Sequence, residues 1–310
     1  MELTIADGRR DFAGMDAVVF RFTRGLVPWR PLPADKNPGQ AWVCFSWESP
    51  SSMVQEDRVA ELPVHATWTY YRGSEITTPY GFYKPGKPVS SRRKPAHEWV
   101  KGKTRLIAWM SSNCKGTFWP RTDFVRELQR YVQVDAYGTC GDLKCQPAWS
   151  AKCNRDLLRE YKFYLSLENS ECEDYITEKL WNKPLLQGVV PVVYGPRREI
   201  YEELLPPNSF IYIGDYKNVK ELADYLKVLN HRTELYAQYL QWQYRGSVEV
   251  LKPMHGSYDP SIFCNLIPVI RRVKRGEMKR RPVKESSFAH SCRSNETFDS
   301  NFGLDNWNPW

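Results

Sequence analysis

Glu178 and Lys179 are adjacent in the motif YITEKLW, and Tyr175 precedes them by three positions. In a helix that opens near Asp174, residues at i, i+3 and i+4 share one face, so these three side chains would lie together near its start. The amino end of a helix favours anions, and a lysine there adds to this preference. The pattern predicts a phosphate-binding group. The alternative is a solvated Glu-Lys pair on an ordinary helix, and the residues alone leave both open.

The segment around this motif has the pattern of a β-α-β unit. An apolar run, Phe163–Leu167, is followed by Glu168, Asn169 and Ser170, then by the helix and a second apolar run, Val189–Tyr194. Crossovers of this kind are right-handed, and ligands bind at the carboxyl ends of the strands. The three polar residues stand at that end.

A second strand end carries similar groups. Ser112 and Asn113 follow the strand that ends at Met110, and Arg121 opens an apolar-periodic helix after a short loop. A guanidinium can hold two phosphate oxygens at once. The hydroxyl and the amide could bond phosphate or ribose, or only close a turn. For Arg121 the alternative is a surface arginine in a first helical turn.

A carboxylate stands at a strand end in the amino-terminal part. Glu48, in FSWESP, follows the apolar run Val43–Trp47 and precedes a proline-bearing turn. Inverting transfer to a hydroxyl group needs only one carboxylate as general base. Without further context, such a glutamate is usually just solvated.

The motifs FYLSLENS, DYITEKLW and GVVPVVYGP together resemble the donor-binding signature of the α1,3-fucosyltransferases of glycosyltransferase family 10. The resemblance continues in FSWESP, WMSSNC, VDAYGTCG and SFIYIGDYKNVKELADYLKVL. It covers about residues 16–265 and leaves residues 266–310 unmatched. The cysteine-containing stretch is most like that of invertebrate and plant-like members that fucosylate the N-glycan core.

The resemblance implies a role for each candidate residue. Glu48 would be the catalytic base, and Arg72, in YYRGSEITTPYG, would lie on the acceptor side. Lys179 and Arg121 would stabilise the departing diphosphate. Tyr164 lies inside an apolar strand, where a core position is the more usual alternative. The implied GDP-fucose-binding residues are Ser112, Asn113, Arg121, Tyr164, Asn169, Tyr175, Glu178 and Lys179.

The resemblance also implies an α/β fold of GT-B type, in which two Rossmann-like domains face each other across a cleft. We predict an acceptor-side α/β domain at residues 1–90, a linker at 91–103, a GDP-fucose-binding domain at 104–270 and a basic, disordered tail at 271–310. Strands are expected at Asp16–Phe22, Ala41–Trp47, Ala66–Tyr71, Arg105–Met110, Val134–Tyr137, Lys162–Leu167, Val189–Tyr194 and Phe210–Ile213, and helices at Arg121–Tyr131, Tyr175–Gln187 and Val219–Asn230.

The formal net charge of +8 suits an anionic partner such as a nucleotide-sugar, a nucleic acid or a membrane surface. Much of the excess stands in the run Arg271–Lys284. Such runs are usually solvated tails, and no RNA-recognition or zinc-finger pattern accompanies this one. Nucleic-acid binding is therefore the least favoured function.

Eight cysteines favour an oxidising compartment. Cys114 and Cys172 flank the predicted donor loops, where they could form a disulfide or remain buried thiols. The sequon at Asn295 fits a lumenal glycoprotein. No run of about twenty apolar residues and no signal-peptide pattern occurs. Because the resembled enzymes are Golgi membrane proteins, we expect a lumenal Golgi catalytic domain whose anchor is missing from this sequence. The alternative is a protein that is not targeted as its relatives are.

Three departures from the family pattern stand out. Lys183 and Pro184 occupy a stretch where relatives carry Asn-Ala, and the proline would bend the helix after its second turn. Cys264 lacks the partner expected near Ile267. The residues around Arg72 differ from those of the vertebrate enzymes, which leaves the acceptor open.

The sequence thus predicts an inverting α1,3-fucosyltransferase that transfers fucose from GDP-fucose to GlcNAc of glycoprotein glycans, with the N-glycan core favoured over lactosamine antennae. No DxD or other paired-carboxylate motif stands near a strand end, so we expect no metal requirement, although Mn²⁺ could stimulate the reaction. The alternative is a catalytically silent homologue that binds a glycan or a nucleotide-sugar.

Overall fold

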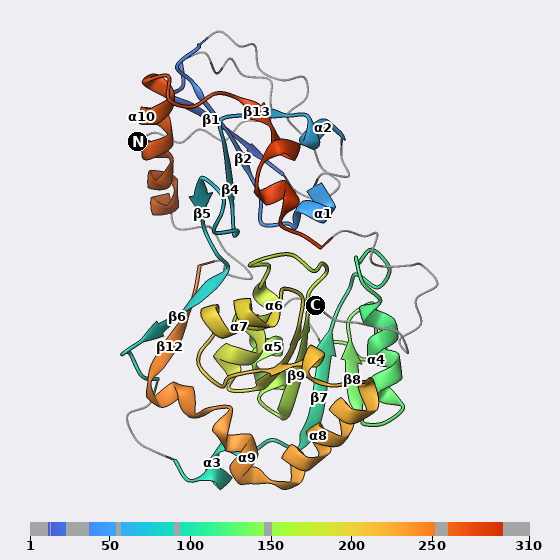
Figure 1. Cartoon of the computed structure of the whole chain (residues 1–310). Helices are drawn as coiled ribbons and strands as arrows, with labels where there is room; N and C mark the ends of the chain where they lie inside the picture. The colour runs from blue at the N-terminus through green and yellow to red at the C-terminus, as the bar shows by residue number, and fades with distance from the viewer. Residues whose placement is uncertain are drawn as a thin grey trace. The chain divides into compact units, whose positions relative to one another are not determined.

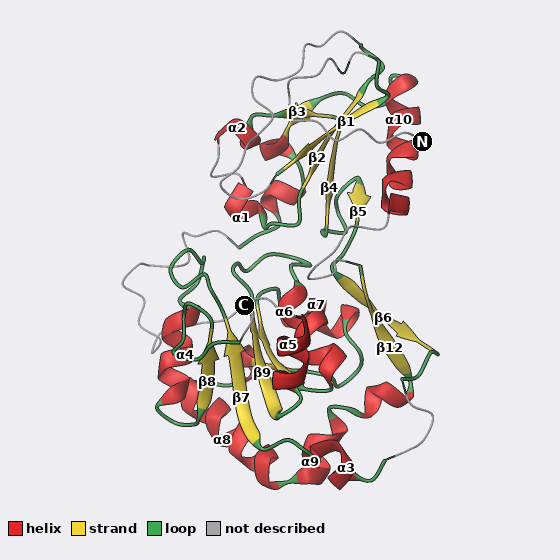
Figure 2. Ribbon diagram, turned by 180° about the vertical axis from the view of Figure 1, so that it is seen from behind, coloured by secondary structure: helices red, strands yellow, loops and turns green. Residues whose placement is uncertain are grey.

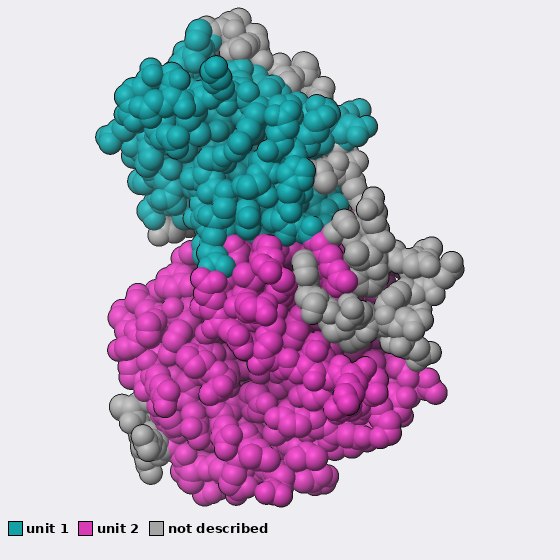
Figure 3. Space-filling view, in the orientation of Figure 1, with its two compact units in different colours: residues 1–79, 258–292 teal, residues 80–257, 293–310 magenta. Residues whose placement is uncertain are grey.

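The computed structural model describes residues 12, 14–22, 37–53, 57–89, 94–145, 151–251 and 260–293. The chain forms two compact units (Figures 1 and 3). Unit 1 comprises residues 1–79 and 258–292, and unit 2 comprises residues 80–257 and 293–310. Each unit contains a parallel sheet with helices, so the predicted α/β class is confirmed.

Unit 2 is built on a parallel sheet of five strands in the order β11-β10-β9-β7-β8. The chain runs from β7 to β8 on one side of β7 and then returns to β9 on its other side. Strand order therefore reverses between β7 and β9, and ligands of open α/β sheets bind at such a switch point. The strands are β7 (Arg105–Met110), β8 (Val134–Tyr137), β9 (Tyr161–Leu167), β10 (Val190–Tyr194) and β11 (Ile211–Tyr212).

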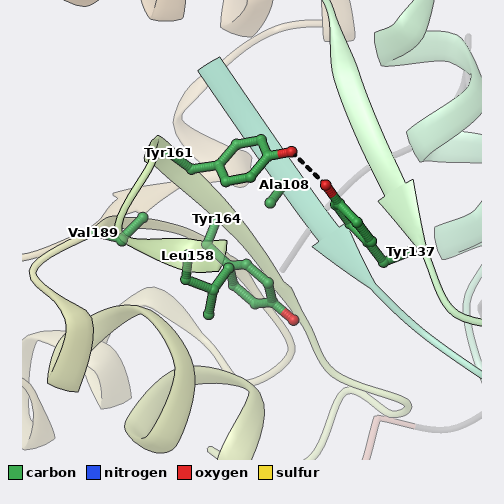
Figure 4. Packing of buried hydrophobic residues seen from close by; sticks show 6 residues of the cluster. All are labelled: Ala108, Tyr137, Leu158, Tyr161, Tyr164 and Val189. Carbon is green, nitrogen blue, oxygen red and sulfur yellow. Dashed lines mark hydrogen bonds between the residues drawn. The ribbon is translucent and has the colours of Figure 1, made fainter. Parts of the chain in front are cut away.

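Helices connect these strands, as Figure 2 shows. One of them, α5 (Ala151–Leu158), was not expected from the sequence. Its Leu158 packs with Ala108, Tyr161, Tyr164 and Val189 in a buried cluster (Figure 4). The other long helices are α4 (Arg121–Gln129), α7 (Arg198–Leu204), α8 (Val219–His231) and α9 (Thr233–Gln238).

The helix of the YITEKLW motif is shorter than predicted and begins later. Asp174 adopts a positive φ of 58°, which is incompatible with an α-helix, and α6 spans only Glu178–Leu180. Thr177 caps it, because its side chain accepts a hydrogen bond from the Lys179 backbone N–H. A π-helix, Trp181–Leu185, follows directly and contains Pro184. Proline has no N–H to donate within an α-helix, and the wider turn is the local result.

Unit 1 holds a parallel sheet of four strands in the order β1-β2-β4-β5. A short antiparallel pair joins β3 (Pro63–Val64) to β13 (Arg281–Pro282). The sheet strands are β1 (Ala17–Arg21), β2 (Ala41–Phe45), β4 (Ala66–Thr69) and β5 (Ile76–Thr77), and the helices are α1 (Pro50–Met53), α2 (Asp57–Ala60) and α10 (Leu266–Lys274).

The predicted disordered tail is wrong for residues 271–293. The helix α10 extends into it, and Leu266, Val269 and Val273 at helical spacing are buried against unit 1. The basic residues between them mask this apolar face in the sequence. The rest of the predicted tail, including Asn295, lies outside the described residues.

The predicted linker at 91–103 is also wrong where it is described. It contains α3 (Ala96–Val100). The preceding β6 (Gly81–Pro85), placed in the first domain by the sequence, pairs with β12 (Gly246–Val250) in unit 2. None of the described helices is long and apolar enough to cross a membrane.

Candidate active site

The carboxyl ends of β7 and β9 are joined by the Arg121 guanidinium. Its Nη1 donates to the Leu167 carbonyl at 3.0 Å and to Asn169 Oδ1 at 2.7 Å. Its Nη2 donates to Ser111 Oγ at 2.9 Å and to the Asn113 carbonyl at 2.7 Å. One side chain therefore fixes both loops at the switch point.

This position differs from the one predicted for Arg121. The residue is only 1% exposed, and burial lowers the pKa of the guanidinium below its ordinary value. Arg121 is therefore neither a surface arginine nor a phosphate ligand that the solvent can reach directly. Arg121 shapes the site from inside the protein, because the loop carbonyls that it holds come from distant parts of the chain.

Asn113 closes the loop after β7, which is one of the two roles predicted for it; the other was binding of phosphate or ribose. Its Nδ2 donates to the Gly116 carbonyl at 2.7 Å, and its Oδ1 accepts from the Gly116 N–H at 3.0 Å. Ser112 beside it is exposed. The Asn169 carbonyl accepts from the Phe118 N–H at 2.8 Å, so Asn169 joins the two loops by backbone and side chain.

Lys179 is held by a buried carboxylate at the end of β9. Its Nζ donates to Glu168 Oε2 at 3.0 Å and to Thr177 Oγ1 at 2.9 Å. Glu168, 1% exposed, also accepts from the Thr177 N–H at 2.7 Å and from the Thr177 hydroxyl at 2.8 Å. Burial raises the pKa of the Glu168 carboxyl, and the converging donors oppose that effect.

The ammonium of Lys179 is partly enclosed but not sealed. Its side chain is 16% exposed, and Glu178 Oε1 lies 3.5 Å from its Nζ. Burial lowers the pKa of Lys179, but Glu168 and Glu178 outweigh burial, so the pKa is raised and the ammonium stays charged. Glu178, with a side chain 32% exposed, is the more accessible member of the pair.

Tyr175 and Tyr164 do not lie where the site prediction placed them. Tyr175 precedes α6 instead of sharing its face, and it is 2% exposed. Tyr164 is fully buried in β9, which confirms the core alternative. Its hydroxyl accepts a hydrogen bond from Lys183 Nζ at 3.0 Å.

Sequence reasoning assigned no role to Glu168, Thr177 or Lys183. Glu168 was placed at a strand end, and the threonine before Glu-Lys is a helix-capping signal. Gly195, after β10, is also required, because a Cβ there would meet the Glu168 Cβ at 2.9 Å. No pattern in the sequence predicts that the backbone of Gly195 lies so close to Glu168.

In unit 1, Glu48 lies in the turn between β2 and α1. Its N–H donates to Ser46 Oγ at 2.9 Å, and its side chain is half-buried. Within the described residues its carboxylate has no hydrogen-bond or ion-pair partner. Glu61 is paired with Lys284, and Glu75 with Arg281. Arg72, the predicted acceptor-side residue, is exposed.

Both alternatives considered for Cys114 and Cys172, a disulfide between them and two buried thiols, are wrong, because Cys114 is bonded to Cys140. This bond links the loop after β7 to the loop after β8. Cys172, like Cys145 and Cys292, is disulfide-bonded, whereas Cys44 and Cys264 are free. The described residues contain no cluster of three or more potential metal ligands.

Ligands of open parallel α/β sheets bind at the carboxyl ends of the strands, and Lys179 is held at such an end by Glu168. Residues 100–285 match the family described as glycosyltransferase family 10 (fucosyltransferase), C-terminal part, and residues 3–81 match the fucosyltransferase N-terminal family. The chain belongs to glycosyltransferase family 10.

Similar proteins are known from insects, nematodes and mammals. A Drosophila melanogaster glycoprotein 3-alpha-L-fucosyltransferase A is 40% identical over 59% of this chain and 36% of its own length. The Caenorhabditis elegans alpha-(1,3)-fucosyltransferase fut-1 is 37% identical over 71% of this chain and 50% of its own length. A Bos taurus 3-galactosyl-N-acetylglucosaminide 4-alpha-L-fucosyltransferase is 36% identical over 85% of this chain and 68% of its own length.

The chain thus spans about a third of the insect relative and half of the nematode one. A solved α1,3-fucosyltransferase with GDP-fucose is 16% identical, with a TM-score of 0.43 over 81% of this chain and 74% of that structure.

Proposed function

We propose that this chain is the catalytic part of an inverting α1,3-fucosyltransferase that transfers fucose from GDP-fucose to GlcNAc of glycoprotein glycans. The observation that carries the proposal is the Lys179 ammonium, which Glu168 and Thr177 hold at the strand ends of unit 2. The names of the insect and nematode relatives, both α1,3-fucosyltransferases, support it.

Lys179 is suited to the donor half of the reaction. When the bond between fucose and GDP breaks, negative charge builds on the diphosphate, and a fixed ammonium stabilises that charge. Its three carboxylate and hydroxyl neighbours orient it before the donor arrives. Glu178, the more exposed carboxylate, is placed to accept hydrogen bonds from sugar hydroxyl groups.

Glu48 is suited to the acceptor half. Its carboxylate is not engaged by any described residue, whereas Glu61 and Glu75 are committed to ion pairs. Glu75 also accepts from the Thr67 N–H at 2.8 Å and the Thr67 hydroxyl at 2.9 Å, which gives it a structural role. A free carboxylate at a strand end can take the proton of the attacking hydroxyl group.

The acceptor and the compartment extend the same proposal. The insect relative is named for glycoproteins, which favours a glycoprotein glycan and its N-glycan core. Disulfide-bonded cysteines fit the oxidising lumen of the secretory pathway, so we place the enzyme on the lumenal side of the Golgi. In this proposal lysine carries the leaving-group charge, and a metal is not required.

A transfer assay tests the function directly. The protein is incubated with labelled GDP-fucose and, separately, an N-glycan core glycopeptide, a lactosamine glycan and no acceptor, while GDP affinity is measured by calorimetry. Label on the innermost GlcNAc of the glycopeptide is expected. GDP binding without transfer to any acceptor would favour the silent homologue, and absence of both would contradict the proposal.

A further inference from the structure

Lys183 lies inside the π-helix that follows the Lys179 segment, immediately before Pro184. In an uninterrupted α-helix, Lys183 would share a face with Lys179, four residues earlier. The π-helix has more residues per turn, and its Lys183 side chain is directed at β9, where it meets Tyr164. The Lys-Pro pair thus directs a second lysine at the middle of β9.

The ammonium of Lys183 is enclosed, and no carboxylate among the described residues forms an ion pair with it. The residue is 6% exposed, its Nζ donates to the Tyr164 hydroxyl at 3.0 Å, and it lies 5.5 Å from the centre of that ring. A neutral hydroxyl does not balance a buried charge. Burial of the ammonium therefore lowers the stability of the fold, and its hydrogen bond to Tyr164 does not offset this loss. A structural role would be filled better by an apolar side chain of the same size.

The charged groups that influence the pKa of Lys183 are those of the candidate donor site. Glu178, Lys179, Glu168 and Arg121 all act on it electrostatically. Together with Lys183, this cluster contains three cations and two carboxylates. Without Lys183 the charges would cancel, so Lys183 supplies the positive excess that an incoming diphosphate would meet.

We propose that Lys183 is a positioning residue of the donor site, whose enclosed ammonium draws the diphosphate of the nucleotide-sugar towards Lys179. The inference rests on the proposed function and adds a residue to it. In this proposal Lys183 does not contact the reacting atoms, because its ammonium stays bonded to the buried Tyr164 hydroxyl.

The electrostatics of the cluster give the inference a pH signature. Burial lowers the pKa of Lys183 to about 8, while Glu178 and Glu168 oppose and Lys179 and Arg121 reinforce that effect. The Lys179 ammonium has a raised pKa and Arg121 stays charged, so Lys183 is the first of these three cations to lose its proton above neutrality. The attraction should therefore be complete below pH 7 and lost by pH 9.

The experiment measures GDP affinity by calorimetry from pH 6.5 to 9 for the unaltered chain, for Lys183→Met and for the control Lys162→Met. Lys162 lies on β9, as Tyr164 does, but its Nζ bonds the Asn230 carbonyl and not the Tyr164 hydroxyl. At pH 6.5, Lys183→Met should bind GDP about tenfold more weakly, by loss of one nearby charge. Between pH 7 and 9 the GDP affinity of the unaltered chain and of Lys162→Met should also fall about tenfold. The GDP affinity of Lys183→Met should not change over that range.

Thermal unfolding separates this role from a structural one. Removing an uncompensated buried charge should leave the Tm of Lys183→Met equal to or above that of the unaltered chain. Equal GDP affinity and equal pH dependence in Lys183→Met and the unaltered chain would overturn the inference, as would weaker binding with a lowered Tm. Failure of the unaltered chain to bind GDP at any pH would overturn the proposed function, and this inference with it.

Discussion

Lys179 Nζ lies 3.0 Å from Oε2 of Glu168, a carboxylate that is buried at the end of the preceding strand. Eleven positions separate the two residues in the chain, and the Thr177 hydroxyl bridges them. The ion pair therefore fixes the lysine to the sheet and not only to its own short helix. This relationship makes Lys179 a preorganised cation.

Lys179→Ala should abolish the stabilisation of the departing diphosphate. We expect transfer to fall by about a hundredfold to a thousandfold, the usual effect of removing one charge-stabilising group. GDP affinity should fall as well, because GDP carries the same diphosphate. Lys227→Ala, which removes a surface lysine paired with Asp224, is the matched control. Unchanged turnover and affinity in Lys179→Ala would remove it from the donor site.

Glu48→Gln should separate the two halves of the reaction. The amide keeps the shape of the side chain but cannot accept the acceptor proton, so transfer should fall by about a hundredfold or more. GDP affinity, measured by calorimetry, should stay unchanged, since the donor residues belong to unit 2. Glu61→Gln removes an exposed ion pair and should retain activity. Normal transfer by Glu48→Gln would exclude it as the base.

Arg121→Lys should destabilise the protein although it keeps the charge. A lysine cannot reproduce the planar set of donors that reaches Leu167, Asn169, Ser111 and Asn113. The unfolding free energy should fall by about 3–5 kcal/mol, as expected when a buried charge loses its partners. Urea unfolding measures it. Arg126→Lys, on the exposed face of the same helix, should change it by less than about 0.5 kcal/mol. Equal effects of the two variants would refute the positional role of Arg121.

Glu171 should make stability depend on pH. Burial raises the pKa of its carboxyl to about 7, against the opposing effects of Tyr194 and Arg293. The folded state therefore binds this proton more tightly than the unfolded state does, and the resulting stability is present below pH 4.5 and lost as pH rises to about 7. The size is on the order of 2–3 kcal/mol.

Urea unfolding at pH 5 and 7.5 would show the effect of Glu171. The difference between the two pH values should shrink in Glu171→Gln, because the amide mimics the protonated acid. The control is Glu173→Gln. Glu173 lies in the same loop as Glu171, and the change removes its ion pair with Arg197. If Glu171→Gln kept the full difference, another group would have to be responsible.

The strands were readable from the sequence because they are local apolar runs. Arg105–Met110 and Val134–Tyr137 have the bounds that were predicted. The start of the Glu178 helix was misplaced: Thr177 is a helix-capping residue, but aspartate is found both inside helices and at positive φ, so Asp174 did not reveal its conformation. The apolar face of α10 was hidden by the basic residues around it.

The strand ends that form the candidate site were predictable, but the contacts between its residues were not. The strand ends that carry Asn169 and Asn113 were identified correctly, because chain order and apolar runs define them. The burial of Arg121 depends on carbonyl groups donated by separate loops, which no local pattern encodes. The direction of Lys183 likewise depends on the π-helix around Pro184.

The composition of unit 1 from residues 1–79 and 258–292 has a consequence for how the protein is made. During synthesis the ribosome finishes all of residues 80–257 before it supplies α10 and β13. Until then Trp68 lacks its contact with Phe263, and Trp42 lacks its contact with Arg280. At typical elongation rates this wait lasts on the order of tens of seconds. The nascent sheet is therefore exposed to chaperones or to aggregation, and the amino-terminal unit, begun first, is completed only after residues 80–257 of unit 2 have been made.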